Sequence, residues 1–168
     1  MAFMRGDVIL KRGYGALGCR LRRLSERIDR DLRDVYQANG VYFDPAWFPV
    51  LAALHDHGPL SLAEIAECTG MASSSVSAVR SRLASEGLLT LEQDPRDLRR
   101  QRLSLTPKAH TTVAALEPIW SAIAKASQAL CAETAPELLN QLEVLEKALS
   151  RRRMPARVKS AMDRSGAR

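Results

Sequence analysis

The 168-residue chain has few of the features that mark an enzyme. It contains no P-loop, no G-x-G-x-x-G, no H-E-x-x-H and no G-x-S-x-G, so the common motifs for phosphate handling, metal-assisted hydrolysis and nucleophilic catalysis are missing. Its carboxylates lie beside basic residues on amphipathic segments, the usual pattern of solvated helices. We therefore predict that the protein is not an enzyme and needs no cofactor.

Cysteine and long apolar runs are also scarce. The three cysteines, Cys19, Cys68 and Cys131, are odd in number and widely spaced, which disfavours a disulfide framework or zinc ribbon and fits a reducing cytoplasm. No run approaches the roughly 18 apolar residues of a membrane helix, and the first residues lack the apolar region of a signal peptide. His55 and His57 point to different faces of a helix and make a poor metal pair. We predict a cytoplasmic protein with no metal site and no membrane partner.

The net charge of +6 comes from one end of the chain. The last 18 residues hold seven basic residues against Asp163, and the other 150 balance at 18 basic and 18 acidic. We expect 151–168 to be a basic, flexible tail, with non-specific phosphate contacts as the alternative.

Residues 61–87 have the pattern of a helix-turn-helix. Ser61 and Glu64 form a capping box, Gly70 lies where a turn between helices needs φ > 0, and Gly87 ends the second helix. That helix is expected to bury Val76, Val79 and Leu83 and to present polar side chains outward. Short hydroxyls near a helix N-terminus suit the DNA major groove, although they also occur on ordinary surface helices. The predicted DNA contacts on this helix are Ser73, Ser74, Ser75, Ser77, Arg80 and Arg82.

A β-hairpin is predicted after this helix. Leucines alternate with polar residues in 88–92 and again in 102–106, as in a half-buried antiparallel pair. Between them we expect a nine-residue loop, Gln93–Gln101, in which Arg96, Arg99 and Arg100 outnumber the aspartates. Such a loop can lie against phosphates or enter a minor groove; the alternative is a solvated charged loop.

The run 61–106 resembles the DNA-binding lobe of the MarR family of bacterial transcriptional regulators. The matching pieces are L-x-E-I-A from Leu62, Gly70, Val76–Ser77, Arg82–Leu83, Gly87–Leu88, and D-P-R-D-L-R with L-S-L-T closing the hairpin. The resemblance implies a mainly α winged helix-turn-helix fold with a small β-hairpin wing. It also implies that Asp97 orders the wing tip and that Arg99 meets the minor groove.

Flanking helices extend the similarity and predict one domain over residues 1–150. Its DNA-binding lobe is expected at about 44–106, and helices at about 13–39 and 107–150 carry apolar seams. Thr134 and Glu137 suggest a capping box within the last segment. In the resembled family such helices interlock as a homodimer that reads a palindromic operator, usually as a repressor released by a small-molecule effector.

The sequence offers two further candidate sites. The aromatic residues near the junction of lobe and dimerisation helices are either core or an effector pocket: Tyr42, Phe43, Trp47, Phe48 and Trp120. Cys19 falls near the position of the thiol of peroxide-sensing relatives, but an inert helical cysteine is the favoured reading. The competing function is a winged-helix module that binds protein and not specific DNA.

Overall fold

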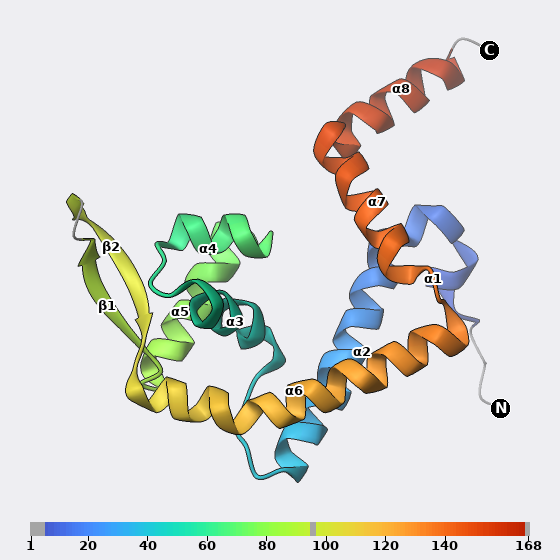
Figure 1. Cartoon of the computed structure of the whole chain (residues 1–168). Helices are drawn as coiled ribbons and strands as arrows, with labels where there is room; N and C mark the ends of the chain where they lie inside the picture. The colour runs from blue at the N-terminus through green and yellow to red at the C-terminus, as the bar shows by residue number, and fades with distance from the viewer. Residues whose placement is uncertain (1–5, 95–96, 167–168) are drawn as a thin grey trace. The chain divides into compact units, whose positions relative to one another are not determined.

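The computed structural model describes residues 6–94 and 97–166, which form two compact units, Met1–Ile119 and Trp120–Arg168 (Figure 1). The first unit carries the helix-turn-helix and the wing. Its elements are α1 (Val8–Lys11), η1 (Gly13–Ala16), α2 (Leu17–Ala38), η2 (Pro45–Trp47), α3 (Phe48–His57), α4 (Leu62–Thr69), α5 (Ser73–Ser85), β1 (Leu89–Asp94), β2 (Asp97–Leu105) and the first part of α6 (Pro107–Thr134). The rest of α6, α7 (Leu138–Arg151) and α8 (Met154–Gly166) form the second unit.

The predicted helix-turn-helix is confirmed. The Glu64 N–H donates to Ser61 Oγ at 3.3 Å, and the Ser61 N–H donates to Glu64 Oε2 at 2.7 Å, so both halves of the capping box are present at the start of α4. Gly70 ends α4 with φ of 68°, a left-handed conformation that a side chain would strain. The turn between α4 and α5 therefore favours glycine at position 70.

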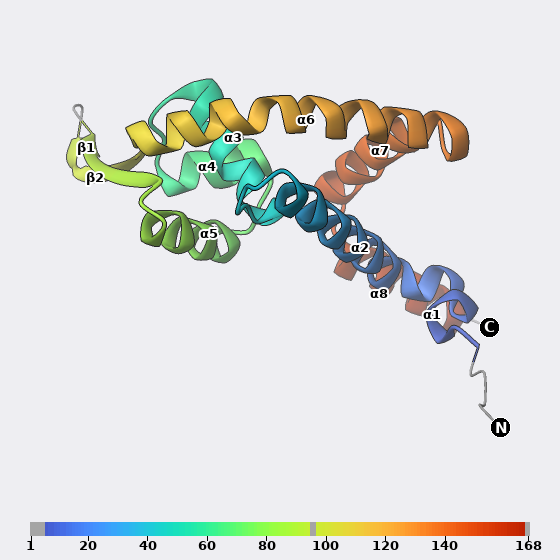
Figure 2. The same cartoon turned by 90° about the horizontal axis from the view of Figure 1, so that it is seen from below.

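A small apolar core holds the lobe together. Helices α3, α4 and α5 gather beside the hairpin in both views (Figures 1 and 2). The largest fully buried side chains come from these helices and from the first part of α6: Val50, Leu51, Ile65, Val76, Leu83, Val113 and Leu116. The predicted inward face of the second helix is confirmed, since Val76, Val79 and Leu83 are all buried.

The wing is longer than the sequence predicted. Strands β1 and β2 pair antiparallel from Leu89↔Leu105 to Gln93↔Gln101 and on to Asp94↔Asp97, with an irregularity after Gln93. The proposed nine-residue loop is therefore wrong, because its backbone continues the ladder on both sides of residues 95–96. The run 93–101 has no alternation of apolar and polar residues, so its sequence did not indicate a strand. Leu60 pairs with Leu103, which ties the loop before α4 to the base of the wing.

A capped 3-10 turn precedes α3. The Ala46 N–H donates to the Asp44 carboxylate at 3.0 Å, which caps η2, and Pro45 follows at its first position. Pro49 lies in the first turn of α3, where a missing N–H costs no helical hydrogen bond, so no kink is needed.

The second unit departs from the prediction at two places. The Thr134 hydroxyl donates to the Leu130 carbonyl within α6 at 2.7 Å, and Glu137 precedes α7 without a side-chain cap, so the predicted capping box is wrong. A helix, α8, forms where a tail was expected. The Arg157 guanidinium donates to the Ala148 carbonyl at 2.7 Å, so α8 caps the end of α7. Among the described residues, no helix is both long and apolar enough to span a membrane.

Candidate nucleic-acid interface

Helix α5 presents a face of short hydroxyls. With 3.6 residues per turn, the side opposite the buried Val76, Val79 and Leu83 carries Ser74, Ser77 and Ser81. Ser74 and Ser81 are exposed, and the Ser81 hydroxyl donates to the Ser77 carbonyl at 3.0 Å. The sequence analysis missed Ser81, although its spacing from Ser74 and Ser77 places it on the same side.

The other predicted contacts of α5 lie on its flanks. Helical geometry puts Ser75 and Arg82 on one flank and Ser73 and Arg80 on the other, and all but the half-buried Arg80 are exposed. The Nε of Arg80 is buried, with no hydrogen-bond partner among the described residues. Part of the Arg80 side chain therefore covers the lobe, as the long stems of arginines often do.

Arg82 faces a carboxylate from a distant part of the chain. Its Nη1 lies 3.6 Å from Asp44 Oδ2, while the Nη1 of Arg33, on α2, lies 4.0 Å from Asp44 Oδ1. We call these three side chains the Asp44 bridge. The Asp44 side chain is 27% exposed and that of Arg82 is 69% exposed. The bridge links α2 to the helix that carries the hydroxyl face.

The predicted wing residues lie at the far end of the hairpin. Arg96 is outside the described residues. Asp97, Arg99 and Arg100 belong to β2, but their side chains are outside the described part of the chain, so their contacts remain predictions. Nearer the base, the Arg102 guanidinium donates to the Pro59 carbonyl, which fastens the wing to the loop before α4.

The predicted aromatic cluster divides into core and surface. Phe43 and Trp47 are buried, with ring centroids 5.7 Å apart, and Tyr36, which the sequence analysis missed, packs edge-on to Phe43 at 4.8 Å. Tyr42 and Phe48 are exposed, with Tyr42 at 79%. Trp120 belongs to the second unit, so its place in this cluster stays a prediction.

A hollow of about 510 Å³ lies beside this cluster. The end of α2 supplies Arg33 and Gln37, and the loop that follows supplies Gly40, Val41, Tyr42 and Phe43. An exposed aromatic ring next to a guanidinium can hold a flat anionic molecule, because Arg binds carboxylates and the ring supplies apolar area.

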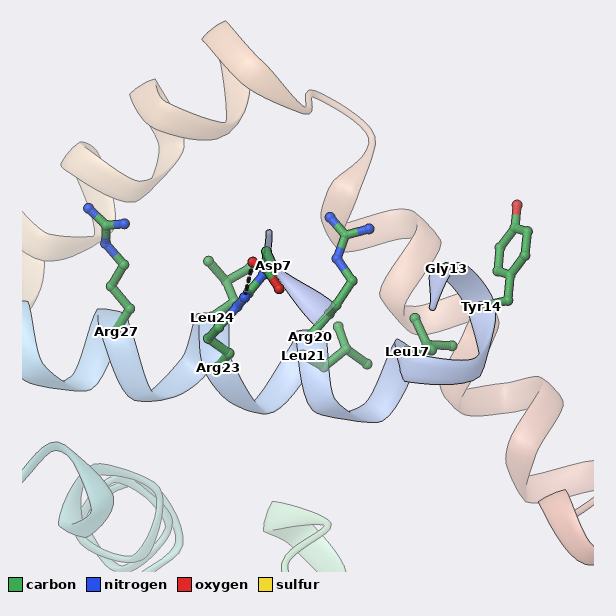
Figure 3. A pocket seen from close by; sticks show the side chains of 9 residues that line it. All are labelled: Asp7, Gly13, Tyr14, Leu17, Arg20, Leu21, Arg23, Leu24 and Arg27. Atoms are coloured by element: carbon green, nitrogen blue, oxygen red, sulfur yellow. Dashed lines mark hydrogen bonds and ion pairs between the residues drawn. The ribbon is translucent and has the colours of Figure 1, made fainter. Parts of the chain in front are cut away.

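A larger groove of about 820 Å³ runs along the N-terminal half of α2 (Figure 3). Its wall is formed by the exposed leucines Leu17, Leu21 and Leu24. Arginines flank them at the three- and four-residue spacing of one helix side: Arg20, Arg23 and Arg27.

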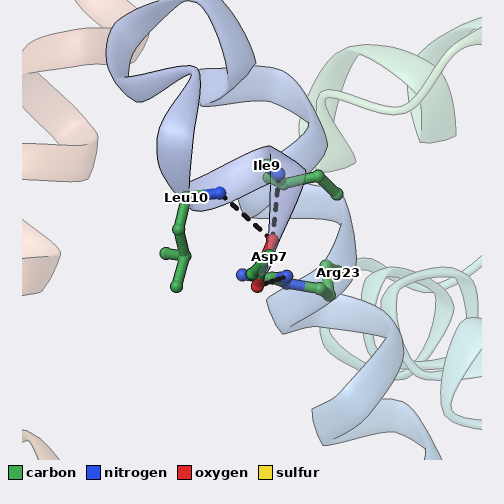
Figure 4. Close-up of polar contacts among 4 residues, drawn as sticks. All are labelled: Asp7, Ile9, Leu10 and Arg23. Atoms are coloured by element: carbon green, nitrogen blue, oxygen red, sulfur yellow. Dashed lines mark hydrogen bonds and ion pairs between the residues drawn. The ribbon is translucent and has the colours of Figure 1, made fainter. Parts of the chain in front are cut away.

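Asp7 fixes the short α1 against this groove (Figure 4). Its carboxylate accepts the N–H groups of Ile9 and Leu10 and pairs with Arg23 at 2.5 Å. The hydrogen bond from Arg23, followed by that from the Leu10 N–H, lowers the pKa of Asp7. These bonds and the ion pair hold the chain before α2 in place.

No redox or metal centre emerges from the described residues. Cys19 and Cys68 are exposed and Cys131 is partly exposed, and all three are free thiols. Within the same part of the chain, no group of three or more His, Cys, Asp or Glu side chains could hold a metal ion.

Sequence comparisons point to one group of proteins. A family model described as the MarR family matches residues 43–100. The HTH-type transcriptional repressor NicR of Pseudomonas putida is 30% identical over 113 residues, which span 62% of this chain and 72% of NicR. The uncharacterized HTH-type regulator YkoM of Bacillus subtilis is 35% identical over 106 residues, 62% of this chain and 66% of YkoM.

Solved structures agree with that grouping. Bordetella bronchiseptica BpsR, whose DNA binding is regulated by 6-hydroxynicotinic acid, matches with a TM-score of 0.59 and 27% identity over 78% of this chain and 91% of BpsR. Streptomyces coelicolor PcaV, solved with its natural ligand, matches with a TM-score of 0.61 and 26% identity over 86% of this chain and 97% of PcaV. With its helix-turn-helix, its wing and these relatives, the chain belongs to the MarR family of DNA-binding transcriptional regulators.

Proposed function

We propose that this protein is a homodimeric, cytoplasmic repressor, without enzymatic activity, that binds a palindromic operator and is released by a small aromatic acid. The observation that carries DNA recognition is the hydroxyl face of α5, with Ser74 and Ser81 exposed and Ser77 half-buried, set after the left-handed turn at Gly70. Serine hydroxyls donate to and accept from base edges, and their small size lets the helix enter deeply. The wing arginines Arg99 and Arg100 add phosphate or minor-groove contacts.

Dimerisation follows from an apolar seam that the described part of the first unit leaves exposed. Its members recur at helical spacing on α2 and continue onto α1 and η1: Val8, Leu10, Tyr14, Leu17, Leu21, Leu24, Ile28 and Val35. Each buried apolar side chain contributes at about 25 cal/mol per Å², so a seam of this length supports a stable interface. A second copy of the chain is the proposed partner.

Two-fold symmetry then sets the geometry of the DNA site. Two copies of α5 related by such an axis read half-sites about one helical turn apart, roughly 34–36 Å. A ligand that favours one angle between the lobes changes this spacing and shifts operator occupancy. Coupling of about 1–3 kcal/mol is typical of such transitions.

The hollow beside Arg33, Tyr42 and Phe43 is the proposed effector site. Its guanidinium and exposed phenol ring suit a carboxylate on a flat ring. The regulation of BpsR by 6-hydroxynicotinic acid makes that compound the first probe for this chain. Arg33→Ala should reduce the response to the probe, and Arg30→Ala, an exposed arginine on the same helix outside the hollow, is the matched control.

Fluorescence anisotropy with DNA from upstream of the coding region tests the proposal. We expect tight binding that survives excess non-specific duplex. The logarithm of the binding constant should fall by about 0.9 for each phosphate contact when the salt concentration rises tenfold. Light scattering should give the mass of a dimer, and 6-hydroxynicotinic acid should raise the operator Kd. If no fragment of a genomic library binds more tightly than the non-specific duplex, the proposal is contradicted and a protein-binding winged helix is favoured.

A further inference from the structure

The hydroxyl face of α5 lacks any long side chain. Its outward positions are occupied by alanine and serine only: Ser74, Ser77, Ala78, Ser81 and Ser85. Bidentate readout of guanine needs Arg or Lys, and bidentate readout of adenine needs Asn or Gln. Within α5, the cations are Arg80, which partly covers the lobe, and Arg82. Arg82 is therefore the long hydrogen-bond donor of α5 that could contact base edges beside the serines.

The Asp44 bridge engages Arg82 on the flank of α5. The carboxylate is fixed at the N-cap of η2 by the bond from the Ala46 N–H, and the Arg82 guanidinium lies 3.6 Å from its Oδ2. Arg33 approaches Oδ1, the other oxygen, at 4.0 Å, which adds a second positive charge beside the same carboxylate. Asp44 is thus held in place from the η2 side and is available to orient Arg82.

We propose that Asp44 determines specificity by holding Arg82 on the flank of α5, so that serine hydroxyls and not a guanidinium meet the bases. This inference rests on the proposed operator binding. An unrestrained Arg82, 69% exposed, would add a phosphate contact on any duplex or favour guanine at one position. The phosphate contact would strengthen binding to every duplex, and the guanine contact would strengthen binding to any duplex with guanine at that position, so neither depends on the bases that the serines read. Asp44 therefore acts through Arg82 as a positioning residue.

The test compares Asp44→Asn, Arg82→Ala and the double variant with the unmodified chain on operator and scrambled duplexes in a salt series. Asn keeps an oxygen to cap the Ala46 N–H but removes the charge that holds Arg82. We expect Asp44→Asn to tighten binding to the scrambled duplex at least about threefold and to steepen its salt slope by about 0.9. The proposal replaces the sequence-based prediction that Arg82 contacts DNA, because Asp44 keeps the guanidinium off the duplex. Arg82→Ala alone should therefore stay within about twofold of the unmodified chain, and the double variant should regain the slope of the unmodified chain.

The control is Asp34→Asn, which makes the same charge change at an exposed position on α2 outside the bridge. Thermal melting of every variant checks that the fold is intact. The inference is overturned if Asp44→Asn behaves like Asp34→Asn, or if Arg82→Ala alone flattens the slope on the operator. If the unmodified chain binds the operator and the scrambled duplex equally, the proposed function fails instead. The measurement on the unmodified chain therefore tells the two failures apart.

Discussion

Removing the hydroxyl of Ser61 tests how the helix-turn-helix is held at its start. The box joins Ser61 Oγ to the Glu64 N–H at 3.3 Å and the Glu64 carboxylate to the Ser61 N–H at 2.7 Å. Ser61→Ala removes the first bond and leaves the second, which uses the backbone of residue 61. We expect the free energy of unfolding to fall by about 1 kcal/mol, as for other N-cap serines. For a chain of this size that corresponds to a decrease in Tm of about 2–4 °C.

The charge of Glu64 gives the same box a pH dependence. The bond from the Ser61 N–H, then that from its hydroxyl, lowers the pKa of Glu64 from its usual 4.5, and the charge of Arg102 adds to the shift. Because the pKa is lower in the folded state, the stabilisation is present at neutral pH and is lost as the pH falls through the folded-state pKa. Glu64→Gln keeps an acceptor but cannot titrate, so its deficit against the unmodified chain should shrink in acid.

Urea unfolding followed by circular dichroism, at one fixed protein concentration, measures both effects. Ser150→Ala is the control, since that hydroxyl only donates to the Glu146 carbonyl of its own helix. The reasoning fails if Ser61→Ala is as stable as the control variant. It also fails if the deficit of Glu64→Gln grows as the pH falls.

Three further predictions concern the turn, the seam and the wing. Gly70→Ala, at φ of 68°, should destabilise the lobe by about 1 kcal/mol in urea melts, and equal stability would contradict the need for a left-handed residue. Leu24→Glu, within the exposed seam of α2, should shift the protein toward monomer in light scattering and weaken operator binding; a stable dimer would place the interface elsewhere. Arg99→Ala with Arg100→Ala should flatten the salt slope by up to about 0.9 for each lost contact, and an unchanged slope would remove the wing from the interface.

Local sequence patterns were enough for the helix-turn-helix and its inward face. The capping box at Ser61, the left-handed turn at Gly70 and the buried side of α5 each depend on neighbours within a few residues, so spacing alone predicts them. The position of Asp44 as a cap could be read in the same way. These features come from backbone chemistry, which is the same wherever the segment folds.

Long-range pairing decided the rest. The wing extends through residues that show no alternation of apolar and polar side chains, and its pairing is between backbones of two strands that meet only in the folded chain. Arg82 was predicted as a DNA contact from α5 alone, and that stays a prediction. Its ion pair with Asp44, which lies 38 positions earlier in the chain, could not be predicted. The sequence by itself determined which helix carries the serines; only the tertiary structure brought Arg33, Asp44 and Arg82 together, since ion pairs between distant segments leave no periodic trace in the sequence.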